Sequence, residues 1–290
     1  MQKRRINACL ILKDGWVVQS IGFRRYLPVG RPEVTVEFLN AWGIDEIILI
    51  DISATARGCP PDFAMVSRVS KHCFVPLAVG GGLATVDAMR RMIRSGADKV
   101  IVNAAALRQP DLVTEAARVL GTQCVVVAID AALDDAGRYQ VYSHLDRRRH
   151  SRSVIEYARE AERRGAGEIL LTSVDRDGSR LGFDVDLVRS VADAVGIEVI
   201  AVGGAGHPSH FEAVFCDGRV NAAAAGNFFH YSEHSVIATK QYLRQRGVEV
   251  RIDTQATYAG TPFDPAGRVG KHADEDLYHR QFSYHPEELI

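Results

Sequence analysis

The chain has 290 residues, of which 47% are hydrophobic and 24% are charged, so it can bury a large core. Its formal net charge of -1 argues against a general basic surface for nucleic acid or an anionic membrane. The basic start is followed by only a short apolar run before Lys13-Asp14-Gly15, which predicts neither a signal peptide nor a membrane span. We therefore expect a cytoplasmic protein.

The five cysteines are scattered, with no CxxC pair and no spacing typical of a zinc site. We interpret them as reduced thiols of the core, and we expect neither a metal nor another cofactor. They are Cys9, Cys59, Cys73, Cys124 and Cys216.

Short apolar runs rich in β-branched residues recur along the chain, as expected of buried parallel strands. Amphipathic, helix-like segments lie between them. Strand followed by helix, eight times over, predicts a closed (β/α)₈ barrel, or TIM barrel, over residues 1–252. The predicted strands are Ile6–Leu12, Ile47–Ile52, Leu77–Val79, Val100–Asn103, Cys124–Asp130, Ile169–Ser173, Val199–Val202 and Asn221–Ala225.

Four of the predicted helices begin with a Thr, Ser or Asp that can cap the first turn through its side-chain oxygen. Such a cap satisfies a backbone N–H that has no partner within the helix. These helices are Thr85–Ser95, Asp111–Leu120, Ser153–Arg164 and Asp184–Ala194.

The sequence also repeats itself. The run DEIILI at residues 45–50 is echoed by GEILLT at residues 167–172, and LAVGGG at 77–82 is echoed by IAVGGAG at 200–206. The offset is about 122 positions in both cases. The repeat unit is therefore predicted to be a half-barrel of four strand–helix pairs.

The periodic pattern stops after about Ile252. Residues 253–290 are rich in Gly, Pro, Asp and His, and we predict an irregular C-terminal extension, either loosely ordered or packed on the barrel. Five aromatic residues favour some packing: Tyr258, Phe263, Tyr278, Phe282 and Tyr284.

Catalytic groups of this fold lie at the C-terminal ends of the strands, where two strands here end in glycines or small residues. Free backbone N–H groups there can bind an anion, which predicts a phosphate site in each half and a substrate with an anion at each end. The alternative is that the glycines only permit tight turns. The predicted phosphate-binding residues are Gly81, Gly82, Asn103 and Ala104 in the first half, and Gly178, Gly203, Gly204, Gly226 and Asn227 in the second.

Asp130 ends the apolar run Cys124–Ile129, which places a carboxylate at the rim of the barrel. A partly desolvated acid there can transfer protons, whereas a carboxylate that only caps a loop is the alternative. The position facing it across the internal twofold lies near residues 10–12, which are apolar.

The motifs KDG, VGGG, ADKVIVNAAAL, QCVVVAID, RGAGEILLTSVDRDG and VGGAG resemble, in order and spacing, the cyclase subunit of imidazole glycerol phosphate synthase, over residues 3 to about 250. The resemblance implies two aspartates on opposite strands as acid and base. Asp130 matches one of them, and Ile11 stands in place of the other. Gln19 replaces a lysine of the family's mobile first loop, here expected over residues 20–32.

The resemblance also implies that ammonia enters through the barrel core from a separate glutaminase docked on the bottom face. Four residues match the charged gate of that entrance, and two more match the glutaminase interface. Charges of alternating sign there can form a closed ring of ion pairs, whose alternative role is to stabilise the barrel floor. The gate residues are Arg5, Glu46, Lys99 and Glu168, and the interface residues are Asp98 and Gln123.

An intact ammonia route with an altered active site resembles a divergent branch of the family that converts an acetamido sugar to an acetamidino sugar, together with a glutaminase and an activating protein. The leading hypothesis is thus a synthase subunit that adds glutamine-derived nitrogen to a phosphorylated or nucleotide-linked substrate, with Asp130 as proton shuttle and Asp177 as its helper. One alternative is the histidine-pathway cyclase, with Asp14 or Asp51 replacing the missing acid. The other is a non-catalytic scaffold that activates a glutaminase.

Overall fold

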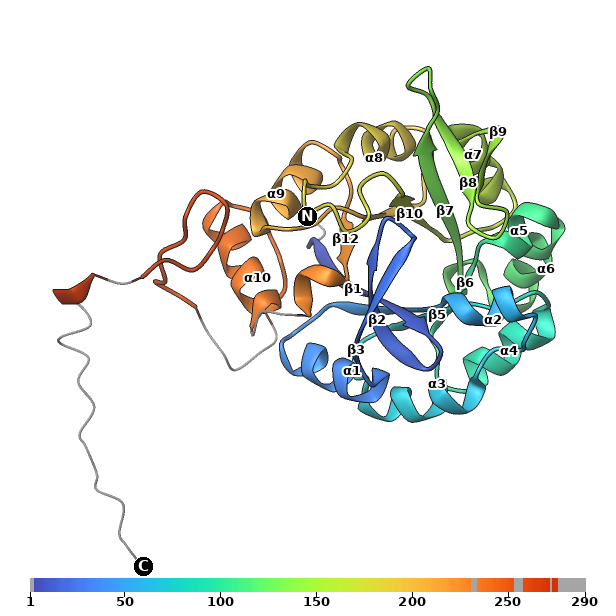
Figure 1. Cartoon of the computed structure of the whole chain (residues 1–290), viewed down its shortest axis with the longest axis horizontal. Coiled ribbons are helices and arrows are strands. Elements are labelled where there is room, and N and C mark those ends of the chain that lie inside the picture. Colours follow the sequence, from blue (N-terminus) through green and yellow to red (C-terminus); the bar gives the residue numbers. More distant parts are fainter. Residues whose placement is uncertain (1–2, 231–233, 253–257, 272, 276–290) are drawn as a thin grey trace, which may run out of the picture.

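A closed ring of eight parallel strands forms the centre of the molecule, with helices around it (Figure 1). The computed structural model describes residues 3–230, 234–252, 258–271 and 273–275. The ring confirms the predicted (β/α)₈ barrel, and each predicted strand overlaps an observed one. The barrel strands are β1 (Arg5–Lys13), β4 (Glu46–Asp51), β5 (Leu77–Gly80), β6 (Lys99–Val102), β7 (Val125–Leu133), β10 (Glu168–Ser173), β11 (Glu198–Val202) and β12 (Ala222–Ala225).

Two antiparallel hairpins extend the barrel strands at the mouth, and the sequence did not predict either of them. β2 (Trp16–Ile21) and β3 (Arg25–Gly30) follow β1, while β8 (Tyr139–Ser143) and β9 (Arg148–Ser153) follow β7. The expected loop over residues 20–32 is therefore wrong for most of its length. Val17 and Val18 on β2 are buried, which gives this hairpin an apolar anchor.

Helices surround the barrel and cover its outer face (Figure 1). Two of the predicted helix caps are confirmed: Thr85 accepts the N–H of Ala88, and Asp184 accepts that of Leu187. The other two are wrong, because Ser153 makes no side-chain cap bond and Pro110 precedes the α6 helix. The α-helices are α1 (Pro32–Ala41), α2 (Ile52–Arg57), α3 (Phe63–Val69), α4 (Val86–Arg94), α5 (Ala104–Arg108), α6 (Asp111–Leu120), α7 (Val154–Arg163), α8 (Val185–Ala192), α9 (Pro208–Cys216) and α10 (Ser235–Gln245), and the 3₁₀ turns are η1 (Ser70–His72), η2 (Thr122–Cys124) and η3 (Asn227–Phe229).

The two halves of the barrel follow the same order of elements. Each half begins with a barrel strand and a hairpin, continues with a helix, and then adds three more barrel strands with their helices. Glu46 begins β4 and Glu168 begins β10, so the sequence echo corresponds to structurally matching positions. The half-barrel repeat is therefore present in the fold.

Part of the C-terminal extension packs on the barrel beside α9 and α10 (Figure 1). Residues 258–271, here called the tail segment, contact Tyr242: its hydroxyl donates to the carbonyl oxygen of Pro265 at 3.3 Å, and its ring meets that of Phe263. The backbone N–H of Ser209 donates to the carbonyl oxygen of Ala266 at 3.3 Å. The tail segment therefore packs on the barrel, which was one of the two predicted alternatives. Tyr278, Phe282 and Tyr284 lie outside the described residues.

The cysteines are all free thiols, but not all belong to the core. Cys9 is buried, whereas Cys59 and Cys216 are exposed, so the prediction of core thiols is wrong for these two. Among the described helices, none combines the length and the apolar character needed to cross a membrane.

Candidate functional site

A cavity of about 1060 Å³ opens at the C-terminal ends of the barrel strands. Its deepest strand positions are small or apolar and include Cys9, Ala128 and Ala224. All of the predicted phosphate-binding residues line it, together with Asp130 and Asp177. The structure therefore brings the candidate residues of both half-barrels into one space, as expected for an active site of this fold.

Asp130 lies near the end of β7 and is only 7% exposed. The side-chain amide of Asn103 donates to its Oδ2 at 2.8 Å. Burial raises the pKa of Asp130, and the nearby Asp177 adds to this, while His144 and the Asn103 hydrogen bond oppose it. A carboxyl group held in this way can carry a proton at a higher pH than an ordinary aspartate, which suits general acid–base chemistry.

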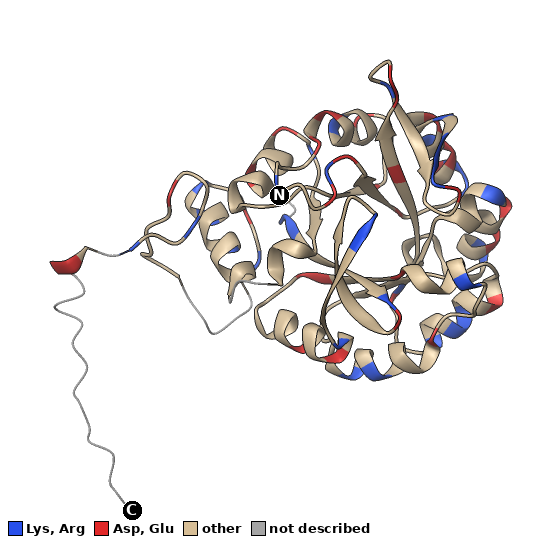
Figure 2. Cartoon of the chain, viewed as in Figure 1, with Lys and Arg blue, Asp and Glu red and all other residues tan. Residues whose placement is uncertain are grey.

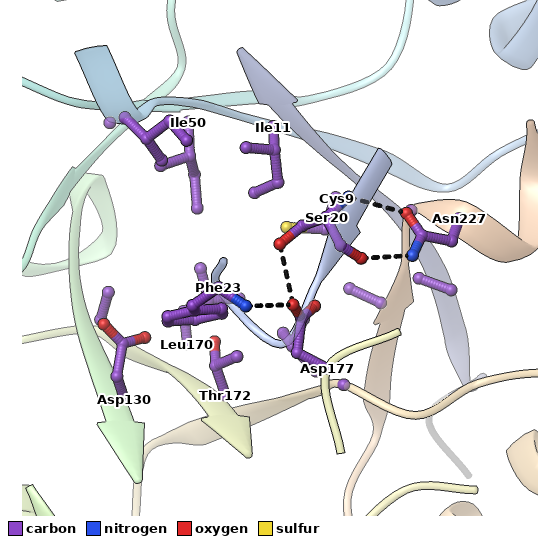
Figure 3. A pocket seen from close by; sticks show the side chains of 18 of the residues that line it. Cys9, Ile11, Ser20, Phe23, Ile50, Asp130, Leu170, Thr172, Asp177 and Asn227 are labelled. Carbon is purple, nitrogen blue, oxygen red and sulfur yellow. Dashed lines mark hydrogen bonds between the residues drawn. The ribbon is translucent and has the colours of Figure 1, made fainter. Parts of the chain in front are cut away.

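Asp177 ties the β2–β3 hairpin down over the mouth (Figure 3). Its Oδ2 accepts the hydroxyl of Ser20 at 2.8 Å and the backbone N–H of Phe23 at 3.0 Å. Burial raises the pKa of Asp177, whereas the hydrogen bonds from the hairpin lower it. Asn227 adds a second tie, because its amide accepts the N–H of Ser20 at 3.2 Å and donates to the Ser20 carbonyl oxygen at 2.6 Å.

Eight of the nine predicted phosphate-binding residues lie along two edges of the cavity, and the ninth is Gly178. The first edge comprises Gly81, Gly82, Asn103 and Ala104, and the second edge comprises Gly203, Gly204, Gly226 and Asn227.

Close packing explains several glycines of these edges. Gly81 has φ 109°, and a Cβ there would collide with the carbonyl oxygen of Asp51, while Gly204 has φ 97° and would collide with that of Gly182. Gly178 lies against the β2–β3 hairpin in the same way. The N–H of Gly82 donates to the Thr55 hydroxyl at 3.0 Å. These contacts require glycine even without an anion, so phosphate binding stays a prediction.

Two arginines distinguish the second edge from the first. Arg180 packs against Gly206, and Arg268 of the tail segment has a guanidinium nitrogen 3.4 Å from Nε2 of His207. Both line the cavity, and no other Lys or Arg of the described residues does so. Many of the other basic residues lie on the surrounding helices (Figure 2). Sequence reasoning missed both arginines, because neither belongs to a recognisable motif.

The opposite end of the barrel carries a closed ring of ion pairs, here called the floor ring. Arg5 contacts Glu46 at 2.8 Å and Glu168 at 3.0 Å, and Lys99 contacts each of the same two carboxylates at 2.8 Å. Burial raises the pKa of Glu46, with Glu168 in the same direction and Lys99 and Arg5 against it. Glu198 approaches Arg5 at 3.5 Å and was not predicted. The four expected residues thus form the alternating arrangement that the sequence indicated.

Comparison with known proteins shows the family of the chain. A family described as "Histidine biosynthesis protein" matches residues 5–235. The chain belongs to this family. It is 47% identical over 252 residues to imidazole glycerol phosphate synthase subunit HisF of Geobacillus thermodenitrificans, covering 87% of this chain and 100% of that protein. It is also 41% identical over 268 residues to the putative subunit hisF2 of Vibrio vulnificus, covering 92% and 98% respectively.

Strand register shows how this member of the histidine biosynthesis family departs from a symmetric site. Ile11 pairs with Ile50 across β1 and β4, as Asp130 pairs with Thr172 across β7 and β10. Ile50 and Thr172 occupy matching places in the repeat, so Ile11 takes the place that matches Asp130. Figure 3 shows the two isoleucines together on one side of the cavity, away from Asp130.

Neither proposed replacement acid takes the place opposite Asp130. Asp51 lines the cavity, but its Oδ1 accepts the N–H groups of Ser53 at 2.7 Å and Ala54 at 3.3 Å as the cap of α2. Asp14 is exposed in the β1–β2 turn and pairs with Arg57. The two isoleucines are thus not compensated by a nearby carboxylate at the matching position.

Asp98 and Gln123 lie at the floor end, directly before β6 and β7, and both are exposed. The carboxylate of Asp98 accepts the N–H of Leu77 at 2.8 Å, and neither residue joins the floor ring. Their position leaves them available on the outer surface of the floor, where the resemblance implies that a glutaminase docks.

Proposed function

We propose that the chain is the ammonia-using synthase subunit of a glutamine amidotransferase complex. The observation that carries this proposal is the floor ring, which lies at one end of a barrel whose other end opens into a cavity lined by the buried carboxyl group of Asp130. The chain is 47% identical to a HisF subunit over the whole length of that protein, which supports the proposal. A glutaminase subunit would dock on the floor around the ring, Asp98 and Gln123, and residues 253–290 would be an extension of the synthase domain, residues 1–252.

The substrate in this proposal is a phosphorylated or nucleotide-linked small molecule that spans the two edges of the cavity. Asp130 transfers the proton when ammonia adds to the electrophilic carbon, and its raised pKa supports that role. Asp177 assists by fixing the β2–β3 hairpin over the reacting centre, where it excludes water. The phosphate groups would take the backbone N–H groups of the first and second edges, with Arg180 and Arg268 at the second.

Ile11 makes a specialised amidation the leading assignment within this class. General acid–base catalysis contributes about 10²–10⁴-fold for each group, and isoleucine cannot exchange a proton. The proposed reaction is therefore amidation of a sugar or related metabolite, such as the conversion of an acetamido group to an acetamidino group, in which ammonia adds to the carbon and displaces the amide oxygen after a separate activating protein has made that oxygen a leaving group. The second candidate is the cyclase reaction of histidine biosynthesis, which the name of the 47% identical relative favours.

Co-purification with the glutaminase, followed by reaction with glutamine labelled with ¹⁵N in the amide, tests the proposal. We expect labelled nitrogen in a phosphorylated or nucleotide-linked product from a screen of acceptors, and no glutaminase complex or no labelled product would contradict it. The two candidates are separated in a histidine auxotroph that lacks the cyclase and carries a compatible glutaminase. The unmodified chain is expected to give no useful growth, and Ile11→Asp at most a trace, whereas full rescue by the unmodified chain would favour the cyclase.

A further inference from the structure

Asn7 lies inside the barrel between the floor ring and the cavity. Side chains alternate along β1, so Asn7 faces the same interior as Arg5 and Cys9. It is completely buried. Its register neighbours are Glu46 on β4, a member of the floor ring, and Ala224 on β12, which lines the cavity. Asn7 therefore occupies the level that anything passing from the ring to the cavity must cross.

The orientation of the Asn7 amide follows from its neighbour. Its Nδ2 donates to Oε2 of Glu46 at 3.2 Å. A carboxylate only accepts hydrogen bonds, so the reversed amide would place two acceptor oxygens against each other. The other polar atom of this side-chain amide, Oδ1, is buried and has no hydrogen-bond partner among the described residues.

The fold itself does not require an amide at this level of the barrel. Val126 on β7 pairs with Glu168 as Asn7 pairs with Glu46, so valine fills the matching place in the other half. Burying an acceptor without a partner disfavours the folded state, whereas an aliphatic side chain carries no such penalty. An asparagine here points to a hydrogen-bond partner for Oδ1 other than the described protein groups.

We propose that Oδ1 of Asn7 accepts a hydrogen bond from ammonia as it passes from the floor ring into the cavity. Ammonia is small, neutral and has three N–H donors, so it can satisfy Oδ1 where the barrel interior is otherwise lined by groups such as Ala224 and Ile48. The contact lowers the cost of moving a polar molecule through an apolar passage. This role rests on the proposed function, and it adds a position to the ammonia route above the floor ring.

A matched pair of variants, Asn7→Val and Asn7→Thr, tests the proposal in the complex with the glutaminase. The two side chains have the same shape, but only threonine keeps an acceptor oxygen. The complex receives ¹⁵N-amide glutamine in a buffer of unlabelled ammonium, together with the acceptor found in the labelled-glutamine screen. The ratio of the two isotopes in the product then measures how much nitrogen arrives through the barrel.

We expect Asn7→Val to lower this ratio about five-fold, the factor that one ordinary hydrogen bond contributes. Asn7→Thr should keep most of the wild-type ratio. Equal ratios in wild type and Asn7→Val would overturn the role of Asn7 while leaving the proposed function intact. An absence of amide nitrogen from the wild-type product would instead contradict the proposed function itself.

A second measurement needs no acceptor substrate and separates ammonia from water as the partner. The side-chain amide of Asn7, assigned by its loss in Asn7→Thr, is followed by NMR while ammonium chloride is added at alkaline and at acidic pH, with sodium chloride as control. We expect a saturable shift only at alkaline pH, where ammonia is present. No shift, combined with a lower melting temperature for Asn7→Val, would show that Oδ1 binds only a structural water and would overturn the proposal.

Discussion

The two half-barrels share one backbone plan but differ in what they present to the cavity. At matching positions, the second half carries Asp130 and Thr172, and the first half carries Ile11 and Ile50. Both cavity arginines also border the second half. One level deeper, the polarity is reversed, because Asn7 of the first half matches Val126 of the second. A repeated backbone frame can therefore keep its register while its two halves present different side chains at matching positions.

The largest expected effect comes from Asp130→Asn, which removes the carboxyl group proposed to carry the proton. Asparagine keeps the shape of the side chain but cannot transfer a proton, so kcat should fall by about 10²–10⁴-fold. Steady-state measurement of product formation with the glutaminase complex checks this. Ile50→Val, at the apolar side of the same cavity, serves as the control and should change kcat little. A loss shared equally by both variants would mean that the halves do not differ in chemistry.

Lys99→Glu tests the floor ring, in which residues of both halves form ion pairs. The variant places a third carboxylate beside Glu46 and Glu168, and breaking buried ion pairs should lower the free energy of unfolding by about 3 kcal/mol. Glutamine hydrolysis should continue while less of its amide nitrogen reaches product. The ratio of product to glutamate measures this coupling, and Lys271→Glu reverses an exposed charge of the tail segment as control. Unchanged coupling in a folded Lys99→Glu complex would refute the ammonia route.

Arg268→Ala tests whether the tail segment takes part in anion binding at the second edge, a contribution that the first edge lacks. Loss of an exposed charge should weaken binding of inorganic phosphate at the second edge about five-fold, corresponding to roughly 1 kcal/mol. Titration followed by NMR of the Gly204 amide provides the measurement, and KM should rise with little change in kcat. Arg244→Ala, on the exposed side of α10, is the matched control. Equal affinity in Arg268→Ala and wild type would remove the tail segment from the site.

The smallest effect concerns stability rather than rate. The folded-state pKa of Asp130 is raised above its ordinary value of 3.8, so the native state binds the proton more tightly than the unfolded state. The contribution of this group to stability is therefore full below the ordinary value and is lost as the pH rises through the folded value. Asp130→Asn does not titrate and should melt at a higher temperature than wild type near neutral pH.

Lowering the pH checks the direction of this difference in melting temperature. The advantage of Asp130→Asn should shrink as the pH falls towards 3.8, the ordinary value for the carboxyl group. Calorimetric melting temperatures across this range measure the difference, and Glu115→Gln, an exposed helix position, should show no comparable gain. If the melting temperature of Asp130→Asn exceeded that of wild type by the same amount at every pH, burial of the ionised carboxylate would not be the cause.

The barrel could be predicted from sequence because its strands are continuous apolar runs and because the motif echo fixed the half-barrel plan. The mouth hairpins could not, since β9 consists of Arg148–Ser153, RRHSRS, which has no apolar alternation. The predicted site residues do line one cavity, because strand ends converge in this fold. The sequence did not predict Arg180, Arg268 or Glu198, because only tertiary contacts bring them to the cavity or the floor ring. Asn7 did leave a signal, as the single amide within the apolar run Ile6–Leu12.

The hydrogen bonds of Ser20 connect the N-terminal part of the barrel with residues that come much later in the chain. Its partners Asp177 and Asn227 follow it by 157 and 207 positions, and β1 also pairs with β12, the last barrel strand. A nascent chain leaving the ribosome therefore holds the β2–β3 hairpin long before it has the residues that fix it. Contacts of such long range form late in folding. The cavity is consequently completed only after nearly the whole barrel has been synthesised, so a truncated product would expose an open mouth without an assembled site.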